Sequence, residues 1–321
     1  MDSPWHSCID SDLAECERLM MKTLQFENKE LTEMCQYVIA SGGKRLRPSL
    51  CILSYYACGG KDEKTPVSVG SAFEIVHSAS LIHDDINDQG EIRRGRKTLH
   101  KKYTMTKAII AGDVMFSMGF DLLKNVGPEV VGYIIEASAA MGSGEFVQKD
   151  YEHASGVTEN HYMKIISGKT AKIFEACAKS GAFTGGGSSE EIHALGEYSF
   201  HLGLAFQIID DMLDVSGDPE KTGKLIGTDL LEGKPTLPTI YAMQDPVYGK
   251  ELQDIFEEPE ASLESVRKAL ELIKKTDSLD RCYKKACEIS SSAKKFLGDI
   301  PDSVYKTSLL NLADYVVSRK R

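Results

Sequence analysis

The chain lacks the features that mark disulfide-stabilised, zinc-binding and membrane-spanning proteins. Its eight cysteines are scattered over 321 residues without a C-x-x-C pair. In a chain of this size that distribution argues against a disulfide scaffold and a zinc site, so we expect the cysteines to fill the core. No run of about 18 apolar residues occurs, and we therefore expect no membrane span.

We also expect no secretory leader, and the sequence shows neither a positive net charge nor an obvious linker. Its first six residues, MDSPWH, contain no basic stretch followed by an apolar one, so we expect a cytoplasmic protein. The net charge of -10 disfavours a general nucleic-acid-binding surface. No break is long enough to separate domains, and we expect residues 1–321 to form a single domain.

Alternating patterns typical of strands are scarce, and the helical period dominates instead. It is clear in residues 73–81 and 195–209. Glycine, proline and polar residues interrupt it at 41–43, 59–62, 185–189, 217–219 and 259–260, and Ser188 or Ser189 ahead of two glutamates resembles a helix N-cap. The sequence predicts an all-α protein, a single large helical bundle with a central active-site cavity between facing helices.

Two aspartate clusters with identical spacing stand in otherwise apolar segments. Their members are Asp84, Asp85 and Asp88 in the first cluster and Asp210, Asp211 and Asp214 in the second. In a helix, the first and last aspartate of a cluster lie about 40° apart around the axis and roughly 6 Å apart along it, so they share one face. An unpaired buried carboxylate would cost several kcal/mol, so the clusters predict a bound cation.

The ligand chemistry of the clusters favours a hard metal ion. All six side chains offer oxygen, and no histidine or cysteine stands at ligand spacing, which suits Mg2+ or Mn2+ better than zinc. Magnesium usually keeps several waters and is shared with substrate phosphates. Opposed clusters facing one cavity therefore predict a phosphorylated substrate.

Basic residues near glycine turns support an anionic substrate, because arginine forks match phosphate oxygens. A double glycine precedes one group, and the amides of a helix start there are free to bind an anion. A segment at 223–238, rich in glycine, threonine and proline, is predicted to close over the ligand as a lid. The candidates are Lys44, Arg45 and Arg47 after the double glycine, Arg93 and Arg94 after the first cluster, and Lys169, Thr170, Lys224 and Lys234.

Together these motifs resemble the trans-isoprenyl diphosphate synthases, or polyprenyl synthetases, over about residues 42–238. The resemblance implies the all-α isoprenoid synthase fold. It rests on G-G-K-R-L-R-P at 42–48, H-D-D-I-N-D at 83–88, R-R-G at 93–95, G-K-T-A at 168–171, F-Q-I-I-D-D-M-L-D at 206–214 and G-T-D-L-L-E-G-K-P-T at 227–236.

The resemblance implies a role for each candidate. The six aspartates would hold as many as three magnesium ions on the diphosphate of an allylic substrate, and Lys169 and Lys234 would stabilise the charge that develops on it. The residues expected to contact this diphosphate are Arg93, Lys169, Thr170, Gln207, Lys224 and Lys234. Those expected to bind the diphosphate of isopentenyl diphosphate are Lys44, Arg47, His77 and Arg94, with Arg45 close enough to help.

The implied reaction is a head-to-tail condensation of isopentenyl diphosphate with an allylic diphosphate, which gives an all-trans polyprenyl diphosphate. Departure of diphosphate leaves an allylic cation, the isopentenyl double bond attacks it, and loss of a proton to the released diphosphate completes the step. Members of the family are typically homodimers with each site inside one subunit, so we expect a homodimer.

Product length is expected to depend on residues before the first cluster. Short-chain members often carry an aromatic residue four or five positions ahead of it, where this chain has Ser80 and Ala79. The tunnel for the growing chain is therefore expected to be open there, with Val76 and Phe73 lying deeper. We expect geranylgeranyl diphosphate or a longer product rather than farnesyl diphosphate.

Two other functions stay open. A class I terpene cyclase shares the first cluster and the cation chemistry, but usually carries a different second metal motif and does not need the basic segment at 42–47. A non-catalytic subunit of a heteromeric prenyl synthase would tend to lose carboxylates, and all six are present. Other charged residues are interpreted as structural, namely Asp113, Glu145, Asp150 and a frayed basic tail at 318–321, while Asp229 is a candidate helix cap.

Overall fold

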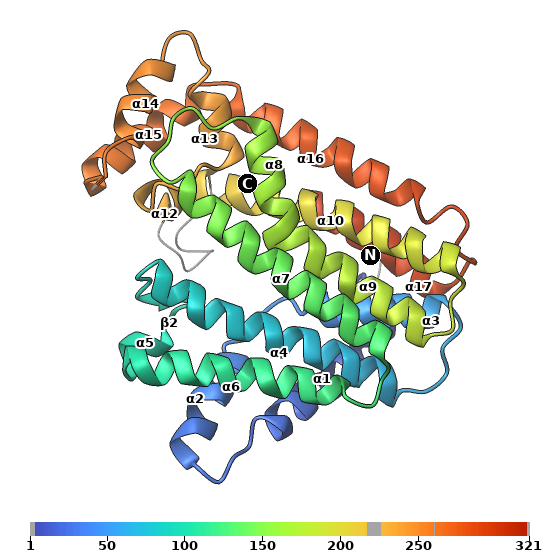
Figure 1. The fold of residues 1–321 in the computed structure, drawn as a ribbon. Helices are drawn as coiled ribbons and strands as arrows, with labels where there is room; N and C mark the ends of the chain where they lie inside the picture. Colours follow the sequence, from blue (N-terminus) through green and yellow to red (C-terminus); the bar gives the residue numbers. More distant parts are fainter. Residues whose placement is uncertain (1–3, 217–225, 260, 320–321) are drawn as a thin grey trace. The chain divides into compact units, whose positions relative to one another are not determined.

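The computed structural model describes residues 4–216, 226–259 and 261–319, and these are almost entirely helical, as predicted (Figure 1). None of the described helices is both long and apolar enough to span a membrane. The helices before the hairpin are η1 (Ser7–Ile9), α1 (Asp10–Thr23), α2 (Lys29–Ile39), α3 (Leu46–Ala57) and α4 (Lys64–Asn87). The hairpin consists of β1 (Ile92–Arg93) and β2 (Arg96–Lys97). The helices after it are α5 (Leu99–Lys102), α6 (Met105–Leu123), α7 (Pro128–Asp150), α8 (Glu159–Ile166), the π-helical turn η2 (Ser167–Ala171), α9 (Lys172–Thr184), α10 (Ser189–Ser216), α12 (Thr228–Leu231), α13 (Leu237–Ala242), α14 (Gly249–Phe256), α15 (Leu263–Lys274), α16 (Ser278–Lys295) and α17 (Val304–Ser318).

The chain divides into two compact units, each of which is described by itself. The first comprises Met1–Glu136, Phe174–Glu197 and Leu297–Leu312. The second comprises Ala137–Ile173, Tyr198–Phe296 and Ala313–Arg321. The first aspartate cluster belongs to the first unit, and the second cluster belongs to the second.

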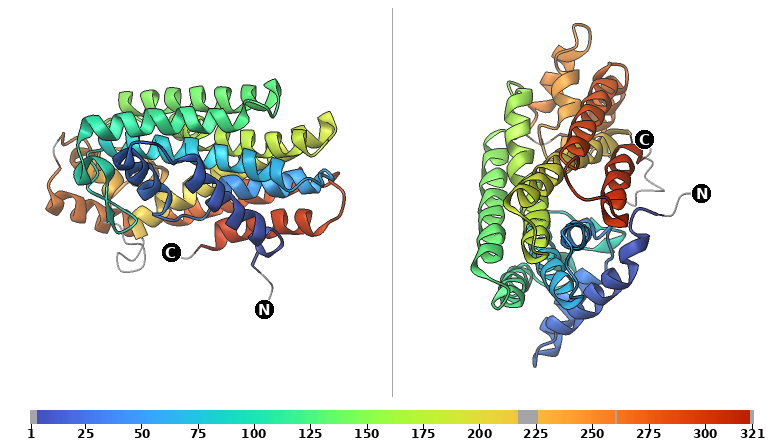
Figure 2. Two further views of the ribbon diagram at one scale, coloured as in Figure 1. Left: turned by 90° about the horizontal axis from the view of Figure 1, so that it is seen from below. Right: turned by 90° about the vertical axis from the view of Figure 1, so that its right-hand side faces the viewer.

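In the first unit, α4 is the central element and packs against α1, α3 and α6. Helices α4 and α6 run side by side in both Figure 1 and Figure 2. Their close approach depends on Gly119, because a Cβ there would lie 2.6 Å from Cγ2 of Val76. The core between them includes Ile75, Ala79, Ala111 and Met115, all fully buried. This packing fixes the end of α4, where the first cluster lies.

In the second unit, the C-terminal half of α10 lies in a core shared with α8, α13, α15 and α16. Its buried side chains include Ile208, Ile209, Met212 and Val215, which flank the second cluster. Burial of these apolar residues therefore determines which face of α10 presents the carboxylates.

Side-chain caps determine several helix starts. Ser188 Oγ accepts a hydrogen bond from the Glu191 amide at 3.2 Å, and the Glu191 carboxylate accepts one from the Ser188 amide at 2.7 Å. This reciprocal pair confirms the predicted cap before α10. The predicted break at 217–219 lies outside the described residues.

All eight cysteines are free thiols, and the buried ones are Cys16, Cys35, Cys51, Cys177 and Cys282, in agreement with a core-filling role.

Candidate functional site

Both aspartate clusters lie at the C-terminal ends of long helices. Asp84 and Asp85 are in the last turn of α4, and Asp88 is its C-cap residue, whose amide donates to the Asp84 carbonyl at 2.8 Å. The second cluster ends two residues before the end of α10. The carbonyl end of a helix carries partial negative charge, which opposes carboxylates and favours cations. Both positions are therefore suited to a metal ion. Without a nearby positive charge, the ionised carboxylates would be destabilised there.

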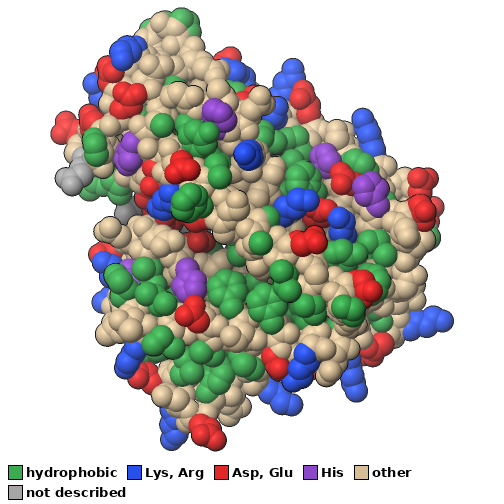
Figure 3. Space-filling model, in the orientation of Figure 1, with side chains coloured by type: hydrophobic (Ala, Val, Ile, Leu, Met, Phe, Trp, Pro, Cys, Tyr) green, Lys and Arg blue, Asp and Glu red, His purple; other side chains and the backbone are tan. Residues whose placement is uncertain are grey.

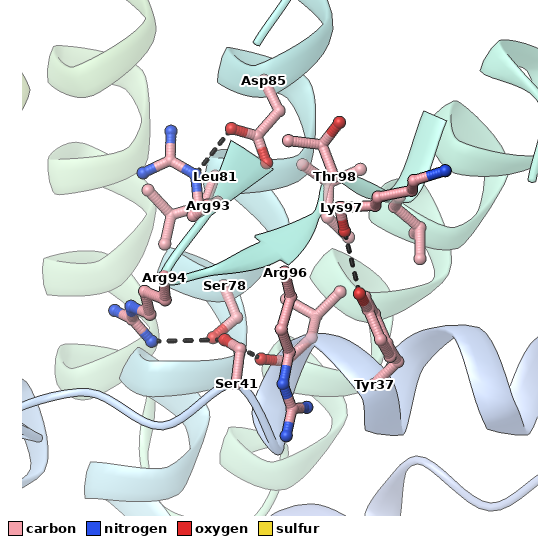
Figure 4. Close-up of a pocket in the computed structure, with 13 residues that line it drawn as sticks. Tyr37, Ser41, Ser78, Leu81, Asp85, Arg93, Arg94, Arg96, Lys97 and Thr98 are labelled. Carbon is pink, nitrogen blue, oxygen red and sulfur yellow. Dashed lines mark hydrogen bonds and ion pairs between the residues drawn. The ribbon is translucent and has the colours of Figure 1, made fainter. Parts of the chain in front are cut away.

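A short hairpin returns the chain to the first cluster (Figure 4). Its turn contains Arg94 and Gly95 with φ values of 53° and 73°, the left-handed conformation that tight two-residue turns require. Arg93 thereby reaches Asp85, and its Nε donates to Oδ1 at 2.6 Å. Burial raises the pKa of Asp85, and the Arg93 guanidinium opposes that shift. The Asp85 carboxylate is thus fixed by its ion pair with Arg93.

A separate basic group surrounds His77 on α4. Burial, and then the guanidinium groups of Arg47 and Arg94, lower the pKa of His77 well below its usual range. The Arg47 guanidinium lies 5.3 Å from the ring centroid of Phe174. Its Nε is buried and has no hydrogen-bond partner among the described residues. A buried unpaired donor beside further cations is suited to an anion such as a diphosphate.

Arg94 packs directly over the glycine turn before α3. A Cβ on Gly43 would lie 2.9 Å from Nη1 of Arg94, and the φ of Gly43 is 147°. The double glycine therefore leaves room for the arginine as well as supplying backbone freedom.

Gly43→Ala is expected to displace Arg94. With the role that the resemblance implies for Arg94, it should also raise the KM for isopentenyl diphosphate roughly tenfold or more, since a hydrogen bond to a charged group is worth about 1.5–3 kcal/mol. Steady-state kinetics with each substrate varied in turn would measure this. Gly42→Ala is the matched control, because Gly42 also has a positive φ but has no atom within 4 Å of the Cβ position. Equal KM values in both variants would contradict the assignment of Arg94.

Arg45 is held within the protein. Its backbone has a φ of 51°, and its side chain is only 8% exposed. Nη1 donates to Glu74 at 2.8 Å and Nη2 donates to the Ile39 carbonyl at 2.8 Å. These contacts fix the turn before α3, and Arg45 therefore helps to position the neighbouring basic residues. Direct contact of Arg45 with substrate stays a prediction. Lys44, the other predicted member, is exposed.

In the second cluster, the middle carboxylate is tied on both oxygens. Tyr162 Oη donates to Oδ2 of Asp211 at 2.6 Å, and Gln207 Nε2 donates to Oδ1 at 2.8 Å. Burial raises the pKa of Asp211 to about 7, against the effect of these two hydrogen bonds. Asp210, whose side chain is 44% exposed, offers the more open oxygens.

A π-helical turn connects this network to Lys169. Thr170 Oγ1 donates to Oε1 of Gln207 at 2.7 Å, so the turn is linked through Gln207 to Asp211. Lys169 forms an ion pair with Glu145 and donates to Oε1 of Gln148 at 3.0 Å. Glu145 was interpreted as part of a solvated face; the structure instead shows it half-buried and paired with a predicted site lysine. Single π-helical turns occur frequently at functional sites.

Asp214 connects the second cluster to α12. Thr228 Oγ1 donates to its Oδ1 at 2.7 Å, and the Asp229 amide donates to its Oδ2 at 3.2 Å. Burial and then Asp214 raise the pKa of Asp229 well above its usual range, whereas Lys234 lowers it. Asp229 thus adds a carboxylate to this region.

The two lysines of the predicted lid differ in what the structure shows of them. Lys234 is paired with Glu232 at 2.7 Å. Lys224 and the start of the predicted lid lie outside the described residues.

The prediction of a frayed basic tail is wrong for Arg319. Its guanidinium donates to the Phe206 carbonyl at 3.1 Å, lies 4.2 Å from the Phe206 ring centroid and is 3.4 Å from Oδ1 of Asp210. The side chain is only 6% exposed. The end of α17 is therefore tied to α10 one turn before the second cluster.

The predicted chain-length positions differ in their surroundings. Phe73, Val76 and Ala79 are fully buried, and Ala79 packs in the core with Ala111 of α6. Ser80 is also buried, and its hydroxyl donates to the His77 carbonyl at 2.9 Å. Ser80 lies four residues before Asp84 and shares its helix face within about 40°, whereas Ala79 does not.

Four site residues were missed or misjudged from sequence: Tyr162, Asp229, Arg319 and Glu145, which pairs with Lys169. Tyr162 stands in a mixed polar and apolar segment, E-N-H-Y-M-K-I-I at 159–166, with no spacing relation to Asp211, so no sequence signal identified it. Asp229 stands in the G-T-D segment that carries the resemblance, and its place in that motif could have identified it as a site residue. Among the described residues, no three histidine, cysteine, aspartate or glutamate side chains form a ready metal cage.

Tyr162→Phe is expected to weaken the apparent affinity for Mg2+ roughly 10–100-fold, the range for groups that orient metal ligands. Loss of the hydroxyl leaves a buried oxygen of Asp211 with one donor fewer. Activity titrated against Mg2+ gives the readout, and Tyr133→Phe is the control, because the Tyr133 hydroxyl makes no hydrogen bond in the described part of the chain. An unchanged titration would show that Tyr162 serves packing alone.

The chain is similar to known proteins over almost its whole length. Residues 28–273 match the family described as polyprenyl synthetase. The geranylgeranyl diphosphate synthase of Methanosarcina mazei is 37% identical over 298 residues, 91% of this chain and 90% of that protein. The all-trans-nonaprenyl-diphosphate synthase (geranyl-diphosphate specific) of Rhodobacter capsulatus is 33% identical over 314 residues, 97% of this chain and 96% of that protein.

Solved structures also show similarity to polyprenyl synthases. The polyprenyl synthase of Caulobacter crescentus, complexed with calcium and isoprenyl diphosphate, matches with a TM-score of 0.94 at 30% identity, covering 99% of this chain and 97% of that one. The resemblance drawn from the motifs is confirmed, and so is the all-α isoprenoid synthase fold. The chain belongs to the polyprenyl synthetase family.

Proposed function

We propose that this protein condenses isopentenyl diphosphate head-to-tail with an allylic diphosphate and releases diphosphate, so that each cycle lengthens an all-trans polyprenyl diphosphate by one isoprene unit. As a member of the polyprenyl synthetase family it is a prenyltransferase. Members of the family depend on metal ions and use isoprenyl diphosphates. Our assignment of individual residues goes beyond family membership and is the part that needs testing.

The carbon–oxygen bond of the allylic diphosphate breaks first, and its electron pair leaves with the diphosphate. Magnesium ions, as many as three, would neutralise that leaving group when bound to the aspartate clusters. Asp84 and Asp210, the first aspartates of the two clusters, are proposed as ligands together with Asp85, Asp88, Asp211 and Asp214. Lys169 and Lys234 are proposed to donate to the same diphosphate, with Arg93, Thr170, Gln207 and Lys224.

The second substrate is proposed to bind at the basic group around His77. Arg47 and Arg94 would hold the diphosphate of isopentenyl diphosphate, with Lys44 at the N-terminal end of α3. The isopentenyl double bond then attacks the allylic cation and forms the new carbon–carbon bond. The proton lost from the adduct goes to the released diphosphate, so the reaction needs no protein base and its charges balance.

The observation that carries this proposal is the unpaired buried Nε of Arg47 beside His77 and a second arginine, Arg94. A terpene cyclase binds one diphosphate, whereas condensation needs a place for two. This basic group would provide the second place, next to the Arg93–Asp85 pair.

The direct test is incubation with Mg2+, labelled isopentenyl diphosphate and each of dimethylallyl, geranyl and farnesyl diphosphate. Linear all-trans prenols after dephosphorylation are the expected products, with geranylgeraniol or a longer alcohol at the end of the series. Cyclic hydrocarbons from an allylic diphosphate alone would contradict condensation in favour of cyclisation. No product with any primer would indicate a non-catalytic subunit.

Ser80→Phe is expected to shorten the product, because Ser80 shares the helix face of Asp84 along which the growing chain is proposed to extend. Ala79→Phe is expected instead to overpack the core against α6 and lower the stability by about 1–3 kcal/mol. Chromatography of the dephosphorylated products and thermal unfolding measure the two effects. A product of unchanged length in Ser80→Phe would show that the tunnel runs elsewhere.

We further propose that residues 1–321 act as a single catalytic domain and that two copies form a homodimer in the cytoplasm. In the first unit, Ile109 and Ile110 of α6 and Ile135 of α7 are 41%, 51% and 52% exposed. Hydrophobic side chains gather over α6 in Figure 3. Apolar side chains exposed in this way are typical of a subunit interface. Sedimentation velocity at micromolar protein should give twice the chain mass; the monomer mass would contradict the dimer.

A further inference from the structure

The hairpin and α5 carry a basic patch that the proposed reaction does not use. Its members are Arg96, Lys97, Lys101 and Lys102, all exposed. The whole chain has a net charge of -10, so four cations within seven residues form a local region of opposite sign. Lys101 is paired with Glu91 at 3.0 Å. Among the described residues, no carboxylate lies within 4.0 Å of the charged nitrogens of Arg96, Lys97 or Lys102.

Tyr37 of α2 holds the patch in place. Its hydroxyl donates to the Lys97 carbonyl at 2.9 Å, and its ring centroid lies 3.8 Å from Nζ of Lys102 and 5.7 Å from the Arg96 guanidinium carbon. A cation over an aromatic face is attracted by the ring. One tyrosine therefore gathers cations from the hairpin and from α5 into one surface.

The hairpin carries the cations of the patch on both of its faces. Ile92 pairs with Lys97 across the hairpin, and directly paired residues project from the same face of a ribbon. Arg93, which reaches Asp85, projects from the other face together with Arg96, its direct partner across the hairpin. Figure 4 shows the Lys97 ammonium on the opposite side of the hairpin from the guanidinium groups of Arg93 and Arg94. The Lys97 ammonium thus points away from the proposed diphosphate site, whereas Arg96 borders the pocket that Asp85, Arg93 and Arg94 line.

Large apolar side chains flank the patch in the chain. Ile92, which shares the face of Lys97, is 55% exposed, and Met105, three residues after Lys102, is 57% exposed. Exposed apolar residues interleaved with unpaired cations are the composition of surfaces that lie on anionic bilayers. A nucleic-acid or acidic protein surface would supply the charge complement but would leave Ile92 and Met105 without an apolar partner.

We propose that the basic patch, with Ile92 and Met105, docks the protein on the surface of a membrane that contains anionic lipid. The cations lie at the headgroups and the two apolar side chains enter the interface. This inference goes beyond the proposed function and does not depend on it, although a polyprenyl product would have the bilayer as its destination.

The test is co-sedimentation of the full-length protein with vesicles of phosphatidylcholine alone and of phosphatidylcholine with 30% phosphatidylserine. Binding is expected only to the anionic vesicles and should weaken as salt is raised. A basic side chain near an anionic surface increases partitioning about fivefold, so the triple change Arg96→Gln, Lys97→Gln and Lys102→Gln should lower it about 100-fold. Ile92→Gln with Met105→Gln should lower it while leaving the salt dependence in place.

The matched control removes the same charge elsewhere, as Lys22→Gln, Lys61→Gln and Lys284→Gln, three exposed lysines outside the patch. This control should bind vesicles like the original protein. Equal binding of the patch and control variants, or equal binding to both kinds of vesicle, would overturn the proposal. So would a patch variant that binds no less but shows a lower, salt-dependent kcat/KM, because the cations would then steer diphosphate substrates. Prenyl transfer assayed without vesicles tests the proposed function independently.

Discussion

Asp84→Asn and Asp210→Asn are each expected to lower kcat on the order of a thousandfold, the loss typical when a group that stabilises transition-state charge is removed. Both carboxylates lie near the carbonyl end of a long helix, where the helix dipole itself favours a cation. The amide keeps the size of the carboxylate and removes its charge. Single-turnover kinetics over a range of Mg2+ concentrations would separate slower ionisation from weaker metal binding.

Asp113→Asn is the control for this pair. Asp113 lies on α6, its side chain is 65% exposed, and it is 3.6 Å from the His83 ring. Its replacement should leave both kcat and the circular dichroism unchanged. If Asp84→Asn or Asp210→Asn retained full activity with an intact helical spectrum, the assignment of the metal site would be wrong.

Lys169→Met is expected to lower kcat by about a hundredfold or more, with a smaller change in the KM for isopentenyl diphosphate. Lys169 is held by Glu145 and Gln148, so its ammonium is already positioned before substrate binds. Such preorganisation is what makes a charged donor effective on a leaving group. Rates measured with allylic substrates whose leaving groups differ in basicity would show whether the loss falls on bond cleavage.

The matched control for this substitution is Lys164→Met, on the same helical stretch but exposed. It removes the same charge at a distance of five residues along the chain. A comparable loss of kcat in both variants would indicate a general effect of charge, and would remove Lys169 from the reaction.

Features that depend on a short stretch of sequence could be predicted for this protein. The helices follow from hydrophobic periodicity, and the Ser188 cap follows from a serine three residues before a glutamate. The aspartate clusters were found because their internal spacing is that of one helix face. Each of these features is encoded within one or two helical turns, so a single stretch of chain is enough to identify it.

Contacts between distant segments could not be predicted in this way. Tyr162 and Asp211 are 49 residues apart, and Arg319 and Asp210 are 109 apart. Nothing in either local pattern specifies such a partner, because tertiary packing chooses it. For the same reason the position of Arg45 in a basic run did not reveal its buried ion pair with Glu74, 29 residues away.

The π-helical turn at Ser167–Ala171 also bears on how such a site is inherited. A π-helical turn has the geometry of an α-helix that has gained one residue, and it connects α8 and α9 without a break in the chain. Deletion of a single codon, for example that of Gly168, would restore a regular helix and remove the wide turn, while α8 and α9 would stay close to their present orientations. Lys169 and Thr170 would then lose their register with Gln148 and Gln207. One inserted residue is thus a heritable marker of this site, and its loss in a descendant gene would signal a change of activity before any charged residue was replaced.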